Sequence, residues 1–110
     1  MTEFDQAVRR ALKQVLPEAE FQPLPLAHPL FRSVFGIEEA RYTPAVLKDK
    51  PGLIDPCLEG IAINGDLRVI YSPYDLEAGW QGCEHPLIRG YESFSAMQLG
   101  INIVMYAMTH

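Results

Sequence analysis

Residues 60–71 read GIAINGDLRVIY, with Asn64-Gly65 between two apolar, β-branched runs. Asparagine and glycine adopt positive φ readily, and both central residues of a type I′ turn need it. We therefore predict two antiparallel strands, at about residues 58–63 and 66–71, joined by this turn. The second run is the more continuous, which is typical of an inner strand of a sheet.

An amphipathic helix is predicted upstream of this hairpin, over about residues 3–16, because apolar residues recur there with a period of 3.6. Thr2 is a suitable N-cap, and Pro17 ends the helix. The basic residues of the helix fall on its other side, where we predict a solvated face. These residues are Arg9, Arg10 and Lys13.

A second helix is predicted near the C-terminal end, over about residues 93–108. Its wide apolar face contains Phe94, Met97, Ile101, Val104, Met105 and Met108. We expect the methionines to fill the core and Gly100 to allow close packing against a sheet. Asn102 lies on this largely apolar helix, so we expect it to be buried and hydrogen-bonded.

The remaining segments are predicted to be connectors. Four prolines between residues 17 and 29 predict an extended chain, in which residues 21–26 alternate like an edge strand. Residues 30–35 favour one helical turn. Residues 38–57 mix charges with three prolines, which predicts a long loop with little regular structure. Another loop is predicted over residues 72–90.

Composition excludes several classes of protein. The chain has 110 residues, so it forms a single domain at most. Its net charge of −5 argues against a nucleic-acid-binding surface. The longest apolar run, residues 101–108, is far shorter than the roughly 20 residues of a membrane span. Charged residues near the start and only two cysteines favour a cytoplasmic protein without a disulfide framework.

The loop over residues 72–86 holds the densest group of reactive and recognition side chains. It follows the end of a strand, where α/β proteins bind ligands. Together with one upstream histidine it supplies the candidate ligand-binding residues, which are His28, Tyr74, Asp75, Trp80 and His85. In the alternative interpretation, Tyr74 and Trp80 pack the loop as hydrophobic lids while Asp75 caps a turn.

No metal site and no cofactor are predicted. The cysteine and histidine residues that could bind zinc are scattered and lack the spacing of ligands. They are His28, Cys57, Cys83, His85 and His110. Neither cysteine follows a strand-to-helix elbow that would expose a nucleophile. The sequence also has no glycine-rich phosphate loop and no HExxH motif.

Five motifs are spread along the chain. They are His28-Pro-Leu-Phe31, Leu58-Glu-Gly-Ile61, Tyr71-Ser-Pro-Tyr-Asp-Leu76, Gly79-Trp80 and Gly100-Ile-Asn-Ile-Val-Met-Tyr-Ala107. Together they resemble a bacterial family known as domain of unknown function 4159, over nearly the whole chain. The resemblance implies a domain similar to class I glutamine amidotransferases and trehalose-utilisation-type proteins, with a flavodoxin-like three-layer α/β fold.

The chain departs from that pattern in two ways. The family domain is about twice as long, so the chain resembles its C-terminal half and lacks the elbow where an amidotransferase carries its cysteine. An amidotransferase also has His-Pro-Glu before its last helix, where this sequence has His85-Pro86-Leu87. Leucine cannot orient an imidazole as a carboxylate does, so glutamine hydrolysis by this chain is not expected.

We therefore expect a truncated flavodoxin-like α/β domain over residues 1–110, with a small sheet, a β-hairpin and a C-terminal helix. Its expected role is that of a non-catalytic binding or interaction module. The alternative is a hydrolase or ligand-processing enzyme that uses the 72–86 loop with His28. An exposed sheet edge and two strongly amphipathic helices favour a homodimer over a compact monomer. The contact surface is expected around Ile61, Ile63, Met97 and Ile101.

Overall fold

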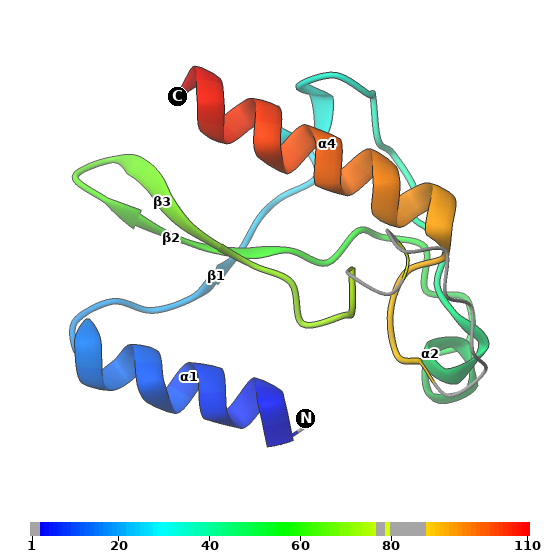
Figure 1. Cartoon of the computed structure of the whole chain (residues 1–110), viewed down its shortest axis with the longest axis horizontal. Coiled ribbons are helices and arrows are strands. Elements are labelled where there is room, and N and C mark those ends of the chain that lie inside the picture. Colours follow the sequence, from blue (N-terminus) through cyan, green and yellow to red (C-terminus); the bar gives the residue numbers. More distant parts are fainter. Residues whose placement is uncertain (1–2, 77–78, 80–87) are drawn as a thin grey trace.

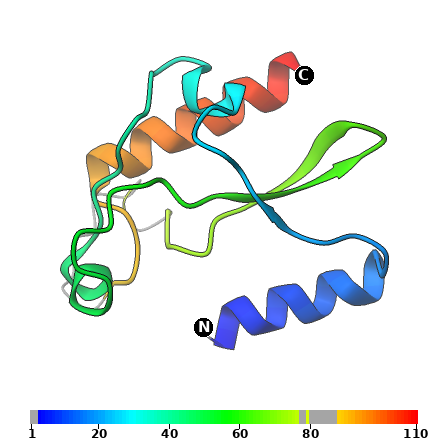
Figure 2. The same ribbon diagram turned by 180° about the vertical axis from the view of Figure 1, so that it is seen from behind.

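The computed structural model describes residues 3–76, 79 and 88–110. Its elements are α1 (Glu3–Val15), β1 (Gln22–Pro23), the 3₁₀ helix η1 (Pro29–Arg32), α2 (Pro44–Asp49), β2 (Glu59–Ile63), β3 (Asp66–Tyr71) and α4 (Ser93–Thr109). In Figure 1 the small sheet lies between α4 above and α1 below, and Figure 2 shows the same order from behind. The structure is thus a small domain of mixed helices and strands, with the predicted C-terminal helix.

β2 and β3 form the predicted hairpin, with Asn64 at φ 55° and Gly65 at φ 83° in the turn. Gln22 of β1 pairs with Gly60 of β2, so the strand order is β1-β2-β3 and each pair is antiparallel. The prediction that the second hairpin strand is the inner one is therefore wrong. The reason is that the proline-rich connector adds its short edge strand to β2 and not to β3.

The hydrophobic core lies against one side of α4. η1 corresponds to the helical turn predicted over residues 30–35, and it packs directly on this helix. The largest fully buried apolar side chains come from η1, from α2 and the segments beside it, from β2, from the segment before α4 and from the inner side of α4. They are Leu30, Phe31, Tyr42, Val46, Leu58, Ile61, Tyr91 and Leu99.

The segment between residues 38 and 57 contains one helix, α2, that the sequence pattern did not predict. Thr43 takes extended N-cap geometry, and Pro44 occupies the first turn, where its missing amide hydrogen leaves no bond unmade. Val46 anchors the helix because it is fully buried in the core. A helix of six residues with one buried side chain gives no periodic signal, and the surrounding charges and prolines are typical of a loop.

Candidate functional site

Tyr74, one of the predicted ligand-binding residues, lies in a cluster of three tyrosine rings. Its ring meets Tyr42 edge-on at a centroid distance of 5.1 Å and Tyr91 at 6.2 Å. Tyr42 in turn stacks on Tyr91 at 4.7 Å, and both are almost fully buried. Tyr74 therefore packs its loop against the core, as the alternative interpretation of this residue expects.

Asp75, the next predicted residue, pairs through its backbone with the segment that leads into α4. Its N–H donates to the carbonyl of Arg89 at 3.0 Å, and its carbonyl accepts from the N–H of Tyr91 at 3.0 Å. Gly90 lies between these two bonds, and a Cβ there would come within 2.1 Å of the Asp75 carbonyl oxygen. Glycine is needed at this position because the two backbones approach so closely.

His28 has a different environment, at η1. Its Nδ1 accepts a hydrogen bond from the N–H of Leu30 at 3.1 Å and so caps η1. Its ring meets Tyr106 of α4 at a centroid distance of 5.4 Å. Burial, and then the charge of His110, lower the pKa of His28 below its usual 6.5. The imidazole is thus engaged as a neutral capping group.

The structure does not bring His28 together with Tyr74. His28 contacts Tyr106 near the C-terminal end of α4, whereas Tyr74 contacts Tyr91, two residues before the N-terminal end; at 1.5 Å per helical residue Ser93 and Tyr106 are about 20 Å apart. The other two predicted ligand-binding residues, Trp80 and His85, lie outside the described residues, as does Cys83. Within the described part of the chain, no three His, Cys, Asp or Glu side chains are grouped as a metal site would require.

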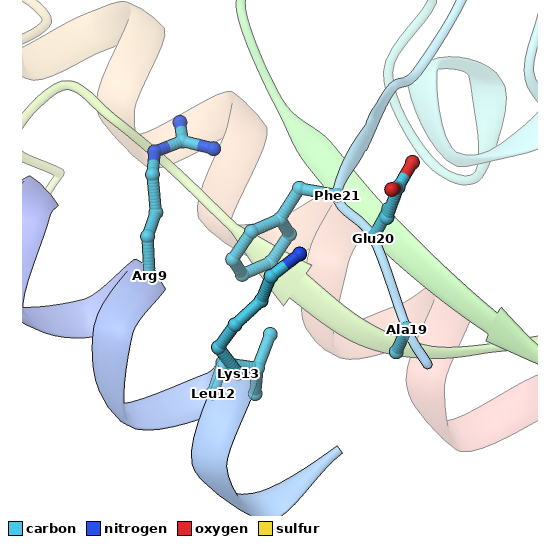
Figure 3. Close-up of a pocket in the computed structure, with 6 residues that line it drawn as sticks. All are labelled: Arg9, Leu12, Lys13, Ala19, Glu20 and Phe21. Atoms are coloured by element: carbon cyan, nitrogen blue, oxygen red, sulfur yellow. The ribbon is translucent and has the colours of Figure 1, made fainter. Parts of the chain in front are cut away.

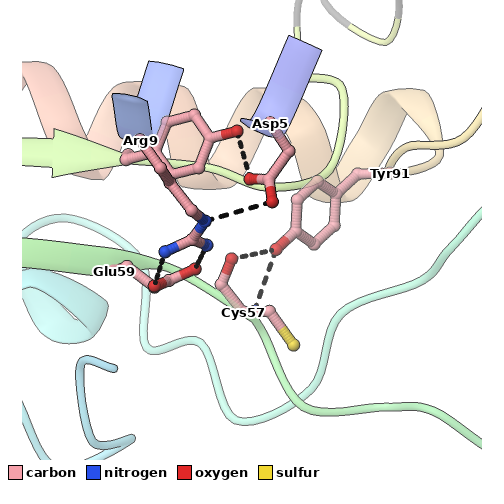
Figure 4. A network of polar contacts seen from close by, with 6 residues as sticks. Asp5, Arg9, Cys57, Glu59 and Tyr91 are labelled. Carbon is pink, nitrogen blue, oxygen red and sulfur yellow. Dashed lines mark hydrogen bonds and ion pairs between the residues drawn. The ribbon is translucent and has the colours of Figure 1, made fainter. Parts of the chain in front are cut away.

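Tyr91 connects the segment before α4 to the segment before β2. Its hydroxyl accepts from the N–H of Cys57 at 2.9 Å and donates to the carbonyl of Cys57 at 3.1 Å (Figure 4). The hydroxyl of Tyr42 donates to the carbonyl of Asp55. Burial raises the pKa of Tyr91 to about 12 and that of Tyr42 well above its usual 10. Both phenols are neutral at physiological pH, and their hydrogen bonds to the backbone link the segment before α4 to the segment before β2.

Arg9 connects α1 to the sheet (Figure 4). Its Nη1 and Nη2 donate to the two carboxylate oxygens of Glu59 on β2, at 3.1 and 2.6 Å, and its Nε donates to Asp5 at 3.1 Å. Tyr71 on β3 donates to the other oxygen of Asp5 at 2.5 Å. The guanidinium also lies over the rings of Phe21 and Tyr71. The prediction that Arg9 belongs to a solvated face is wrong, because these partners draw it toward the sheet.

The carboxyl of Asp5 is ionised in this network. Burial raises its pKa, but the hydrogen bonds from Tyr71 and Arg9 and the charge of Arg9 outweigh burial, so the pKa lies below its usual 3.8. Burial, followed by the bond to Asp5, raises the pKa of Tyr71 well above 10. The charges of the network are thus used to hold a helix on a sheet, which is a structural role.

An open hollow of about 270 Å³ lies beside this network, between α1 and the connector to β1 (Figure 3). It is lined by Arg9, Leu12, Lys13, Ala19, Glu20 and Phe21. Lys13 and Glu20 are both exposed at its rim and carry opposite charges, so the hollow favours neither an anion nor a cation. The guanidinium of Arg9 is already paired with carboxylates. We therefore assign no ligand to this hollow.

The outer face of α4 is a long apolar stripe without a partner among the described residues. Its side chains and their exposed fractions are Phe94 69%, Met97 52%, Ile101 38%, Val104 56%, Met105 38% and Met108 75%. The helix has no charged residue along its 17 positions. The prediction that the methionines fill the core is therefore wrong for this helix. Among the described residues, no helix has the length and hydrophobicity needed to cross a membrane.

A groove of about 270 Å³ lies along this stripe, lined by Met97, Gly100, Ile101 and Val104. Gly100 was expected to pack against the sheet, but it lines the groove on the outer face of α4. Ile61 was expected on the contact surface, but it is 2% exposed, because it faces the buried side of β2.

The outer face of α4 is the candidate interaction site of the domain. The sequence carried a signal for it: a long, largely apolar helix with no charged residue has more apolar surface than one core-facing side can bury. The prediction placed Met97 and Ile101 on a contact surface, and both are exposed in the structure, but it also assigned the methionines of this helix to the core. The structure shows that Ala96, Leu99 and Asn102 face the core instead.

Comparison with known proteins places the chain in a family. No match was found to a curated protein or to a solved structure. The model of the family described as "Domain of unknown function (DUF4159)" matches residues 1–108, which is nearly the whole chain. This is the family that the five sequence motifs resemble. The chain therefore belongs to the DUF4159 family.

Proposed function

We propose that this domain is a non-catalytic interaction module that associates with a second copy of itself through the outer face of α4. One observation carries the proposal: six large apolar side chains of an uncharged helix are 38–75% exposed along one stripe. Exposed apolar area of this kind is costly in water unless a partner covers it. A second copy is the partner that is present whenever the protein itself is made.

The size of the stripe is consistent with a weak dimer. The exposed parts of the six side chains amount to on the order of 500 Å², close to the largest patches that monomeric proteins expose. A standard interface buries about 800 Å² per partner. The α4 stripe alone is smaller than that, so we expect weak self-association, with a dissociation constant on the order of micromolar or higher.

The proposal includes the finer assignments that the motif resemblance implies. These are a bacterial, cytoplasmic protein and a class I amidotransferase-like domain with a flavodoxin-like fold. Such a fold is built on a parallel sheet, whereas the strand pairs described here are antiparallel. The α4 face is also a surface on which further layers of that fold could lie, and a concentration-independent mass of 12.4 kDa would favour that occupant over self-association.

A non-catalytic role is supported by the placement of the candidate residues. An enzyme that used the 72–86 loop with His28 would need these groups at one site. His28 instead caps η1 near the end of α4, while Tyr74 is packed near its start. No described observation favours the hydrolase alternative over the interaction module.

The test is sedimentation equilibrium from 1 to 200 µM, roughly spanning the expected dissociation constant. We expect the mass to rise from 12.4 kDa toward twice that value with concentration. Ile101→Asp should keep the protein monomeric, because it places a charge in the middle of the stripe. Val15→Asp, at an apolar α1 position that is 73% exposed, is the matched control and should associate like the wild type. A concentration-independent mass of 12.4 kDa for the wild type would overturn the proposal.

A further inference from the structure

The groove on α4 has the geometry of a hole into which a side chain of a second helix can pack. Its four lining residues, Met97, Gly100, Ile101 and Val104, are spaced i, i+3, i+4 and i+7. This is the set of four residues that forms a hole in knobs-into-holes packing of two helices. A volume of about 270 Å³ leaves room for one apolar side chain. The groove therefore fits a knob from a facing helix better than it fits a free polar ligand.

Four of the exposed side chains on α4 are also arranged symmetrically about Ile101, whereas the mirrored position of Val104 holds Gln98. Phe94 and Met108 lie seven positions before and after Ile101, and Met97 and Met105 lie four positions before and after it. Large residues therefore face large residues when the helix is reversed and laid on itself. A two-fold axis requires this kind of self-complementarity, because the same patch serves both partners.

We infer that the partner of the α4 face is the α4 helix of a second copy, packed antiparallel about a two-fold axis at Ile101. In this arrangement Ile101 of each copy enters the groove of the other. Met97 faces the partner's Met105, and Phe94 faces the partner's Met108. This inference rests on the proposed function and adds the orientation and the register of the two helices.

The electrostatics of α4 agree with this orientation. No charged side chain lies on the helix, so two copies approach without like-charge repulsion along the stripe. Antiparallel packing brings the positive N-terminal end of each helix dipole beside the negative C-terminal end of the other. Parallel packing would bring like ends together. The same uncharged surface would therefore favour the antiparallel arrangement.

A charge-swap experiment tests the register. Met97→Glu and Met105→Lys are made singly and together, at positions that are 52% and 38% exposed, so folding should persist, and circular dichroism checks that it does. Each single variant should raise the dissociation constant at least tenfold, because it places an unpaired charge in an apolar seam. The double variant should recover to within about threefold of wild type at low salt, since each introduced glutamate then faces an introduced lysine of the partner.

Two further measurements distinguish failure of the antiparallel register from failure of self-association itself. The recovered dimer should weaken in 1 M NaCl more than the wild type does, because salt screens its new ion pairs. Phe94→Lys with Met108→Glu repeats the swap at the ends of the stripe, where the side chains are 69% and 75% exposed. If the wild type never associates, the proposed function fails. If it associates and Ile101→Asp abolishes this, but neither double variant recovers, only the antiparallel register is overturned.

Discussion

Asn102 and Phe35 are joined by a reciprocal pair of hydrogen bonds across the core. The N–H of Phe35 donates to Oδ1 of Asn102 at 2.9 Å, and Nδ2 of Asn102 donates to the carbonyl of Phe35 at 2.9 Å. Oδ1 also accepts from the N–H of Val34 at 3.1 Å. Asn102 is fully buried, so the prediction of a buried, hydrogen-bonded residue is confirmed. The amide side chain of Asn102 therefore supplies hydrogen-bond partners for the backbone groups of Val34 and Phe35.

Replacement of Asn102 by leucine should destabilise the domain strongly. Two backbone N–H groups and one carbonyl would lose their partner, and a buried unsatisfied group costs about 1–3 kcal/mol. We expect the free energy of unfolding to fall by about 3 kcal/mol or more in urea denaturation. Gln98→Leu, at a half-buried position on the same helix, is the control and should change it by less than about 1 kcal/mol. Equal effects of the two substitutions would contradict this role of Asn102.

The anchoring of α1 should depend on acid pH through Asp5. Its pKa in the folded state lies below the usual 3.8, so its contribution to stability is present above that value and is lost as pH falls through the lower, folded-state pKa. At pH 7, Asp5→Asn should lower the free energy of unfolding by about 2 kcal/mol. This difference should shrink steadily below about pH 4.

Urea denaturation at pH 7, 5, 4 and 3 checks this pH dependence. Glu3→Gln, an exposed position on the same helix, serves as the control and should show only a small effect. A difference between wild type and Asp5→Asn that stays constant down to pH 3 would show that the charge of Asp5 does not hold α1.

The hydroxyl of Tyr91 should contribute to stability through the backbone of Cys57. Tyr91→Phe leaves the N–H and the carbonyl of Cys57 without this partner, so we expect a loss of about 1–3 kcal/mol. Thermal unfolding measures it. Tyr106→Phe removes a hydroxyl from a half-buried ring at the other end of α4 and is the matched control. An unfolding temperature of Tyr91→Phe equal to that of the control would show that the hydrogen bonds between the Tyr91 hydroxyl and the Cys57 backbone do not stabilise the fold.

The hairpin turn should require glycine at its second position. Gly65→Val should lower stability by more than about 1 kcal/mol, because φ at this residue is 83° and a β-branched side chain is strained there. Gly36→Val is a close control, since a Cβ would meet no atom within 4 Å at either position but only Gly65 has positive φ. Similar unfolding midpoints for the two variants would show that the turn tolerates another residue.

The parts of the fold that local chemistry determines could be predicted from sequence. Asn64 and Gly65 tolerate the positive φ that a tight type I′ turn requires, which few other residue pairs do, so the two strands beside the turn followed directly. The long run from Ser93 to Thr109 has no breaker, so the helix was predicted correctly despite its β-branched residues. The edge strand at Gln22 was indicated by alternation, and the pairing with β2 confirms it.

The parts that depend on distant partners could not be predicted in this way. Arg9 is separated from Glu59 by fifty residues, and nothing near Arg9 in the sequence indicates a carboxylate across the sheet. The placement of His28 at the far end of α4 from Tyr74 depends on how η1 docks on that helix. Periodicity showed that α4 is apolar, but it could not show that the core would cover only one side of the helix.

The pairing of Tyr42 with Tyr91 also has a consequence for the rate at which the chain folds. The two residues are 49 positions apart, whereas the hairpin closes around a two-residue turn. Hairpins form in roughly 1–10 µs, but the segments around Tyr42 and Tyr91 can meet only after a long loop has closed, with its larger entropic cost.

We expect the hairpin to form early and the docking of α4 to be the late step of folding. Substitutions at the turn should then slow folding, while those at Tyr91 should mainly speed unfolding.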